Sequence, residues 1–249
     1  MEIVLPKARS KPEVKNPSNL IIFSKPKTGK TSLVAALDGC LLLDFEQGSN
    51  YVEAMKMKID NIKHLKLVGK AIKDADYPYK YIAVDTVTAL EDMCIPYAET
   101  LYSQSPMGKN WFNEGGGKSK YGNIIGMPEG AGYYWLRLAF TKVIDYITTL
   151  APHMILLGHV KDTMLEKDGV NFSTKELDLT GKLKRITTSN SDAIAYLYRK
   201  GNQNILSFKT TDDVGCGARP DHLKNVEIVI SEINEEGEII THWDKVFID

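Results

Sequence analysis

The sequence lacks the features of a membrane-spanning or secreted protein. No apolar run approaches the roughly 20 residues that a membrane-spanning helix needs, and the polar residues 1–19 hold no hydrophobic segment of the kind found in secretory signals. The chain has only three cysteines, which lie far apart and include no Cys-x-x-Cys pair. An odd number of thiols cannot all pair within one chain, which favours a reducing compartment. We therefore expect a cytoplasmic protein with buried thiols and no membrane partner.

An excess of charge of one sign is also missing. The 31 Lys and Arg residues balance 32 Asp and Glu residues, so the formal net charge is −1. Without a global basic field, binding to nucleic acid would need a local basic stripe or several copies assembled around the polymer. No internal repeat is visible. At 249 residues and 43% hydrophobic content, the chain is suited to one large α/β domain, which we place at residues 20–249.

Residues 1–19 differ in composition from the rest of the chain. They combine prolines with basic side chains, namely Pro6, Lys7, Arg9, Lys11, Pro12, Lys15 and Pro17. This composition predicts a flexible or extended arm rather than a helix. A solvated tail is the simpler interpretation, and a docking arm for a neighbouring subunit is the alternative.

The strongest motif is a phosphate-binding loop. Residues 20–23 are an apolar run typical of a buried parallel strand, residues 24–29 form a polar loop, and Lys30 and Thr31 begin a helix. We expect backbone N–H groups from about Lys27 to Thr31 to surround the β-phosphate of a nucleotide. Lys30 would reach the β and γ oxygens, and the Thr31 hydroxyl would bind Mg²⁺. The predicted nucleotide-binding residues are Ser24, Lys25, Pro26, Lys27, Thr28, Gly29, Lys30, Thr31 and Ser32.

The loop departs from the usual motif at its first position. Ser24 stands where the motif has glycine, so either Ser24 adopts an unfavourable backbone conformation or the loop opens differently. Pro26 lacks an N–H and cannot donate to a phosphate. The alternative is a chance Gly-Lys-Thr at a strand-to-helix turn, but the flanking strand and helix argue against it.

Acidic side chains end two further apolar strands. Residues 40–46 end in Asp44 and Glu46, and residues 79–84 lead into Asp85 and Thr86. Ligands of open parallel sheets bind at these carboxyl ends. We expect Asp85 to hold Mg²⁺ through water and Glu46 to act as general base for an attacking water. The alternative is that all three acids cap strand ends or helix N-termini.

The remaining pattern predicts a mixture of helices and strands. We expect helices through Met55 and Lys56 and at 70–75, 89–101 and 133–150, and strands at 65–68, 154–159 and 204–210. Residues 161–182 predict a hairpin or mobile loop, and residues 226–242 a C-terminal hairpin.

A glycine-rich stretch covers residues 103–132. From Ser103 to Arg137 there are four basic residues and two acidic residues, with aromatic side chains among them: Lys109, Lys118, Lys120 and Arg137, Glu114 and Glu129, and Trp111, Phe112 and Tyr121. Such a loop could contact single-stranded DNA by charge and stacking, or it could be a lid over the nucleotide. The sequence leaves both interpretations open.

The order of these motifs resembles the RecA-like ATPase core. The phosphate loop is followed by Leu-Asp-Phe-Glu at 43–46, Ile-Ala-Val-Asp-Thr at 82–86 and Leu-Leu-Gly-His at 156–159. The chain looks most like phage RecA-like AAA-family ATPases of single-strand annealing and recombination systems, and residues 215–223 look like a feature of that group. The resemblance implies a RecA-like P-loop NTPase core: a mostly parallel sheet flanked by helices, with a C-terminal β-hairpin.

The resemblance also implies roles for individual residues. Glu46 falls on the catalytic glutamate, and His159 falls on the sensor of the γ-phosphate that is joined to a DNA-binding loop; the alternative for His159 is a core histidine. Related ATPases insert a basic residue from a neighbouring subunit, for which the candidates are Lys182, Lys184 and Arg185.

The sequence thus predicts an ATPase that acts on single-stranded DNA in phage-type recombination, annealing or replication. Its catalytic residues would be Glu46, Lys30 and His159, its metal ligands Thr31 and Asp85, and its cofactors ATP and Mg²⁺. We expect a homo-oligomer in the cytoplasm, which is that of the host if the chain is phage-encoded, with a single-stranded-DNA-binding protein as a candidate partner. A P-loop small-molecule or nucleotide kinase and a nucleotide-binding interaction module without turnover are the alternatives.

Overall fold

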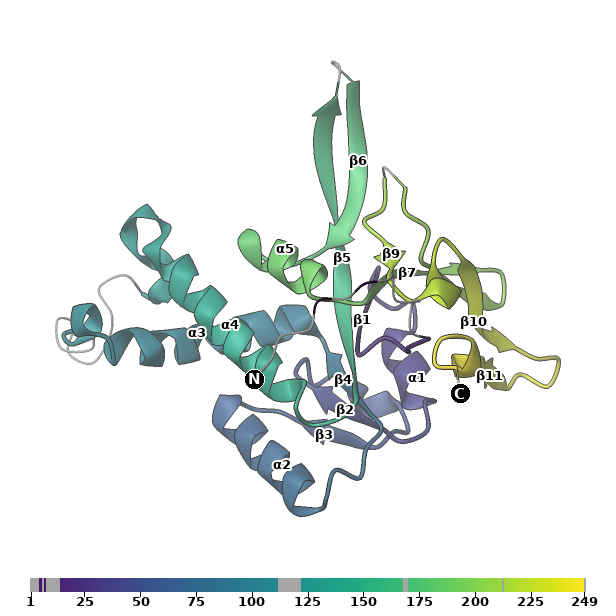
Figure 1. The fold of residues 1–249 in the computed structure, drawn as a ribbon, viewed down its shortest axis with the longest axis horizontal. Coiled ribbons are helices and arrows are strands. Elements are labelled where there is room, and N and C mark those ends of the chain that lie inside the picture. Colours follow the sequence, from purple (N-terminus) through teal and green to yellow (C-terminus); the bar gives the residue numbers. More distant parts are fainter. Residues whose placement is uncertain are drawn as a thin grey trace.

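The core of the protein is one large, mostly parallel sheet (Figure 1). The computed structural model describes residues 5, 7, 14–111, 122–167, 170–211 and 213–248. The strands are β1 (Asn19–Ser24), β2 (Cys40–Asp44), β3 (Lys56–Lys58), β4 (Tyr81–Asp85), β5 (His153–Lys167), β6 (Val170–Leu177), β7 (Ala193–Lys200), β8 (Gln203–Ser207), β9 (Gly217–Ala218), β10 (Glu227–Ile233) and β11 (Ile239–Thr241). Their order is β11-β10-β8-β7-β1-β5-β4-β2-β3, with β6 paired to β5 and β9 to β7.

The parallel part of the sheet runs from β7 to β3. Strands β8, β10 and β11 extend it in antiparallel fashion, and β10 and β11 form the predicted C-terminal hairpin. The expected mostly parallel sheet is therefore confirmed. Because β5 lies between β1 and β4, the phosphate loop after β1 and the acid that ends β4 are separated by the width of one strand.

Helices cover both faces of the sheet. They are α1 (Lys30–Ala35), α2 (Ile62–Asp74), α3 (Val87–Ser103), α4 (Ala131–Ile147) and α5 (Lys182–Ser189). Alternate residues of β1 point to opposite faces of the sheet. Ile21 and Phe23 pack with α2, α3 and α4, whereas Leu20 and Ile22 pack with α1 and with the C-terminal segment, residues 243–248. This burial on two faces explains why β1 is apolar at every position from 20 to 23.

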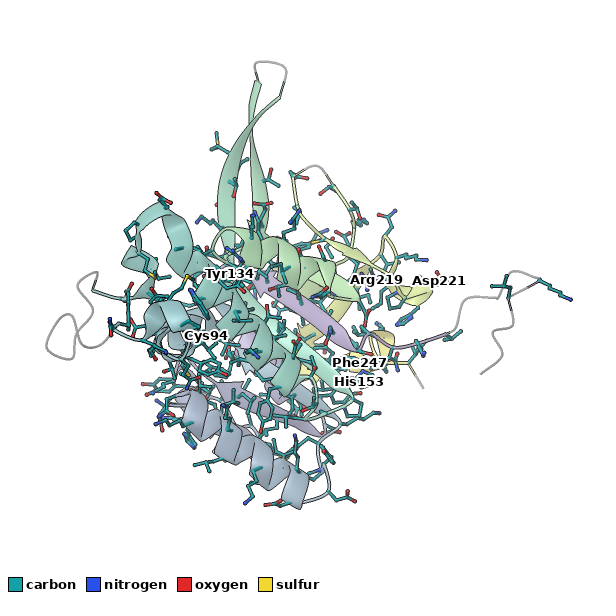
Figure 2. The ribbon with its side chains drawn as sticks, turned by 60° about the vertical axis from the view of Figure 1, so that its left-hand side comes forward. Cys94, Tyr134, His153, Arg219, Asp221 and Phe247 are labelled. Atoms are coloured by element: carbon teal, nitrogen blue, oxygen red, sulfur yellow. The ribbon has the colours of Figure 1, made fainter. Side chains whose placement is uncertain are left out.

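The C-terminal segment packs at the end of the sheet opposite the phosphate loop. Figure 2 shows Phe247 beside His153, the first residue of β5. Their ring centroids are 5.2 Å apart, and the Phe247 ring is 4.6 Å from that of Tyr81. Nearby, the Asn16 side chain bonds to both the carbonyl and the N–H of Ile248. Residues 16 and 248 are therefore attached to each other beside the amino ends of the central strands.

Two predictions between residues 51 and 75 are wrong. Met55 and Lys56 do not lie in a helix, because residues 56–58 form the edge strand β3. Residues 65–68 do not form a strand, because they belong to α2, which begins after Asn61 with its side chain accepting from the His64 N–H. The buried side chains of α2 recur at helical spacing, and a short apolar run alone does not separate strand from helix.

Strand β5 is longer than predicted and leaves the sheet. Beyond Val160 it pairs with β6 in an antiparallel ribbon that projects from the body of the molecule (Figure 1). The prediction of a hairpin within residues 161–182 is confirmed, because β5 and β6 pair there as antiparallel strands.

The glycine-rich stretch is described only in part. Phe112, Lys118, Lys120 and Tyr121 lie outside the described residues. Trp111 is buried, with its ring 5.1 Å from that of Tyr102, so it packs in the core and is not exposed for stacking on a base.

The three thiols agree with the expectation of buried free cysteines. Cys40, Cys94 and Cys216 are all free and buried. Burial raises the pKa of Cys40 and of Cys216 to about 12, which keeps these thiols protonated and unreactive at neutral pH. Among the described helices, none has the length and apolar character needed to cross a membrane.

Candidate active site

The phosphate loop joins β1 to α1 at the carboxyl edge of the sheet. Its left-handed residues are Lys27, with φ of 62°, and Gly29, with φ of 101°. Ser24 remains in the strand, so the unfavourable conformation considered for it falls at Lys27 instead. The Ser24 hydroxyl is buried, donates to the Lys25 carbonyl at 2.9 Å and accepts from the Lys30 ammonium at 3.0 Å. The serine that replaces the usual glycine thus positions the lysine of the motif.

The Lys30 side chain is only 6% exposed. Its ammonium contacts Ser24 Oγ at 3.0 Å and the Lys25 carbonyl at 3.4 Å, and in the described part of the chain no carboxylate lies within ion-pair distance of it. Burial lowers the pKa of Lys30, while the charges of Asp85 and Glu46 act in the opposite direction. A buried cation that is only partly neutralised favours the arrival of an anion, and a nucleotide phosphate would supply that charge.

Asp85 and Thr31, the two predicted metal ligands, lie in direct contact. The Thr31 hydroxyl donates to Asp85 Oδ2 at 2.7 Å, and Asp85 is 4% exposed. Burial raises the pKa of Asp85, and the hydrogen bond from Thr31 partly offsets this effect. A bound divalent cation would favour the ionised carboxylate and reverse the effect of burial.

These oxygen donors fit Mg²⁺. This ion is usually held by one or two protein side chains, with water and phosphate oxygens completing its shell. Across the residues that the structure describes, no cluster of three or more His, Cys, Asp or Glu side chains could hold a metal alone. Thr31 and Asp85 would therefore hold Mg²⁺ together with the nucleotide, and not in a separate protein cage.

Glu46 lies where β2 and β4 end, beside the middle of β5. Its Oε1 accepts from the Thr86 hydroxyl at 2.6 Å and lies 2.7 Å from His159 Nε2. The backbone N–H groups of Phe45 and Glu46 both bond to the Asp85 carbonyl, which ties the segment after β2 to the end of β4. The structure thus brings Glu46, Thr86 and His159 together beside the Asp85 carboxylate, as the strand-end rule predicted.

His159 connects this cluster to the phosphate loop. It lies opposite Ser24 in the parallel pairing of β1 and β5. Its Nδ1 atom is buried and has no hydrogen-bond partner within the described residues. One ring nitrogen therefore contacts the Glu46 carboxylate, and the other is enclosed without a hydrogen-bond partner among the described residues.

Asp44 has a structural role. It is fully buried and accepts from the backbone N–H and the hydroxyl of Ser49, at 3.1 and 2.6 Å, and from the Gly48 N–H. It therefore fixes the turn after β2, in agreement with the capping alternative, whereas Asp85 contacts Thr31 and Glu46 contacts Thr86 and His159.

The basic cluster on α5 divides into two groups. Lys184 forms an ion pair with Glu176 of β6 and is occupied within the chain. Lys182 and Arg185 are exposed, and neither forms an ion pair with a described residue. Only the latter two are positioned to reach another molecule.

A buried carboxylate on α3 was missed by the sequence analysis. Glu91 is 5% exposed and accepts from the Thr180 N–H at 3.1 Å, and burial raises its pKa. Thr88, one turn earlier, donates to the Asp178 carbonyl at 3.0 Å. These contacts fix the segment between β6 and α5 to α3. Nothing in an amphipathic helix distinguishes such a glutamate from an exposed one.

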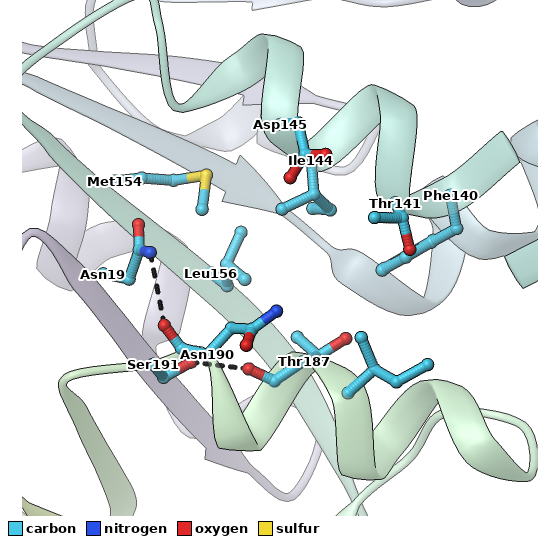
Figure 3. Close-up of a pocket in the computed structure, with 11 residues that line it drawn as sticks. Asn19, Phe140, Thr141, Ile144, Asp145, Met154, Leu156, Thr187, Asn190 and Ser191 are labelled. Atoms are coloured by element: carbon cyan, nitrogen blue, oxygen red, sulfur yellow. Dashed lines mark hydrogen bonds between the residues drawn. The ribbon is translucent and has the colours of Figure 1, made fainter. Parts of the chain in front are cut away.

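The hollow drawn in Figure 3 is separate from this site. Its lining includes Asn19 and Met154, at the amino ends of β1 and β5, and Thr187 and Asn190, at the end of α5. Its volume is about 30 Å³, which suits about one water molecule and not a nucleotide.

A comparison with known protein families agrees with this geometry. A family model described as an AAA domain matches residues 16–219, which include every residue of the site. AAA domains are generally P-loop ATPases that bind nucleotides, typically with Mg²⁺. No curated protein matches the chain. Since the match covers most of the sequence, the chain belongs to the AAA domain family.

Proposed function

We propose that this protein is a Mg²⁺-dependent ATPase that acts on single-stranded DNA in phage-type recombination, annealing or replication, and that it works as a homo-oligomer. The observation that carries the proposal is the position of Glu46. A carboxylate held by Thr86 and His159, next to Asp85 and the phosphate loop, is placed to activate a water. A phosphate loop alone would equally suit a kinase or a module without turnover.

The chain's own residues account for the chemical step. Mg²⁺, when bound, neutralises charge on the β and γ oxygens. Lys30 adds a positive charge at the same oxygens. The attacking water forms a bond to the γ-phosphorus, the bond to the ADP oxygen breaks, and the water's proton passes to Glu46. Thr86 and His159 hold Glu46 in place through Oε1, which leaves its second carboxylate oxygen to contact the water.

A hollow between the amino ends of α4 and α5 supports contact with DNA. It has a volume of about 520 Å³, and its lining includes Gly130, near the end of the glycine-rich stretch, Arg137 of α4, and Thr180 and Lys182, which follow the β5–β6 ribbon. Arg137 and Lys182 form no ion pair with a described residue, and Tyr133 adds an aromatic ring that is 37% exposed. Two cations and an aromatic ring are the groups that bind the backbone and bases of single strands.

A short segment connects this hollow to Glu46. The His159 carbonyl accepts from the Asp178 N–H at 2.9 Å, and two residues further on Thr180 is bonded to Glu91. Lys182 begins α5 immediately after this segment. A movement of His159 on ATP binding would therefore reach the hollow through residues 178–182.

Binding of a labelled oligothymidine, measured by fluorescence anisotropy, tests the DNA part of this proposal. At one salt concentration, we expect tighter binding with a non-hydrolysable ATP analogue than with ADP. The double variant Arg137→Ala/Lys182→Ala should weaken binding, and a salt titration should show a log–log slope that is shallower by about 0.7 for each phosphate that the variant no longer neutralises. The variant Lys58→Ala/Lys70→Ala removes the same charge from β3 and α2 and should bind like wild type. Absence of DNA binding by the wild type in every nucleotide state would contradict the proposal.

A further inference from the structure

A second hollow lies directly beside the phosphate loop. Lys25, Lys27 and Thr28 line one side of it, and the consecutive residues 196–199 of β7 line the other. Its volume is about 370 Å³, within the range of small-molecule pockets. The loop that would hold the phosphates of a nucleotide therefore also forms a wall of this hollow.

The strand order shows which part of a nucleotide would reach it. Glu46, Asp85 and His159 follow or lie on β2, β4 and β5, all on one side of β1. The hollow lies on the other side, where β7 pairs with β1. A triphosphate whose terminal phosphate faces Glu46 and Asp85 extends its α-phosphate away from them, toward β7. The nucleoside that follows the α-phosphate is thus directed into the hollow.

The walls carry groups that suit a nucleoside. Tyr196 and Tyr198 are two residues apart on one strand, with ring centroids 6.2 Å apart and planes inclined by 18°. Tyr196 also packs against Phe23 of β1 at 5.4 Å. The Tyr198 hydroxyl donates to Glu227 Oε1 at 3.1 Å, which fixes the orientation of its ring. A fixed aromatic ring at the edge of a hollow offers a stacking surface for a base.

Arg199 provides hydrogen-bond donors at the same place. Its Nε donates to Asn204 Oδ1 at 3.3 Å, and Asn204 in turn donates to the buried Ser231 hydroxyl at 2.9 Å. Asn204 also lies under the phosphate loop, because a Cβ placed on Gly29 would lie 3.8 Å from its Nδ2. The guanidinium is therefore anchored through Nε beside the loop, and the structure records no partner for its other N–H groups among the described residues.

We propose that this hollow is the nucleoside subsite, in which Tyr198 stacks on the base and Arg199 contacts the ribose hydroxyls. The inference rests on the ATPase function proposed above and adds to it the residues that select a nucleoside triphosphate over bare polyphosphate. The phosphate loop serves both ligands, whereas Tyr198 and Arg199 serve only the nucleotide.

Affinities for ATP and for inorganic tripolyphosphate, both with Mg²⁺, test the subsite. Isothermal titration of the wild type should give tighter binding of ATP. Tyr198→Ala should weaken ATP binding by about tenfold, since stacking of a base on an aromatic ring corresponds to a factor of roughly 5 to 150. Tripolyphosphate affinity should not change, and this binding also reports that the variant is folded. Tyr198→Phe keeps the ring and should retain most ATP affinity. Tyr51→Ala removes a ring that is 99% exposed and should behave like wild type.

The outcomes separate this inference from the proposed function. Equal affinity of the wild type for ATP and tripolyphosphate, or an equal decrease in affinity for both ligands in Tyr198→Ala, would overturn the subsite while leaving the ATPase proposal intact. If Tyr198→Ala does not fold, Arg199→Ala provides the same test, because it should weaken ATP binding and not tripolyphosphate binding. A wild type that binds neither ligand would contradict the proposed function itself.

Discussion

Replacement of Glu46 by glutamine isolates its role as a base. The amide oxygen of Gln can still accept from the Thr86 hydroxyl and contact His159 Nε2, the two interactions that hold Glu46 at 2.6 and 2.7 Å. The side chain keeps its size but loses its charge and its ability to take a proton. We therefore expect Glu46→Gln to bind ATP normally and to turn it over slowly.

The size of the effect follows from the chemistry of the step. A positioned general base contributes about 10² to 10⁴ in rate, or roughly 2.7 to 5.5 kcal/mol of the barrier. Since the contacts around Glu46 are retained in the variant, this decrease should appear in turnover and not in ATP affinity. We expect turnover to fall by about 10²-fold or more.

Two measurements on the same preparation check this prediction. Phosphate release at saturating Mg²⁺ and ATP gives turnover, and titration with a non-hydrolysable analogue gives affinity. Glu235→Gln, which changes an exposed carboxylate in the turn between β10 and β11, is the matched control and should hydrolyse ATP at the wild-type rate. Wild-type turnover in Glu46→Gln would refute the reasoning and assign Glu46 a structural role.

Three further variants probe the other parts of the site. Lys30→Ala should lose ATP binding but not stability, since burial already lowers the pKa of Lys30 and its charge adds little to folding; unchanged ATP affinity on titration would contradict this. Asp85→Asn should lose Mg²⁺-dependent hydrolysis. Without nucleotide it should melt about 2–4 °C higher than the wild type, which corresponds to a free energy of unfolding that is larger by about 1 kcal/mol. The direction follows from burial, which raises the pKa of Asp85: the native state binds more protons than the unfolded state above pH 3.8, so stability falls as pH rises through the native pKa. A lower melting temperature would contradict it. His159→Ala should keep most ATP affinity, yet its affinity for oligothymidine should be the same with ATP analogue and with ADP. If the DNA affinity of this variant depends on the nucleotide as strongly as that of the wild type, the sensor role is excluded.

The central strands could be predicted because of how they are buried. Strands β1, β2 and β4 lie inside a parallel sheet, and nearly all their residues are apolar. The edge strand β3 alternates Lys and Met and carries no such signal, and apolar residues inside α2 resemble a short strand. Local sequence patterns therefore failed where a segment lies at the edge of the sheet or has few apolar residues to reveal a period.

The site could be predicted as far as the strand-end rule reaches. Parallel strands place their carboxyl ends at one edge, which located Glu46, Asp85 and His159 from sequence. The proposed nucleoside subsite could not be found in this way, because the pairing of β7 with β1 is what brings Tyr198 beside the phosphate loop. Glu91 was missed for a similar reason, since its partner Thr180 is distant in sequence.

The most direct test of the central claim is ATP hydrolysis by the purified wild-type chain, measured with Mg²⁺, with Mg²⁺ removed by chelation, and in Lys30→Ala. The account predicts phosphate release that requires Mg²⁺, that is abolished in Lys30→Ala and that increases when single-stranded DNA is added. Tight binding of Mg²⁺ and ATP without phosphate release, with or without DNA, would contradict it and would favour a nucleotide-binding module without turnover.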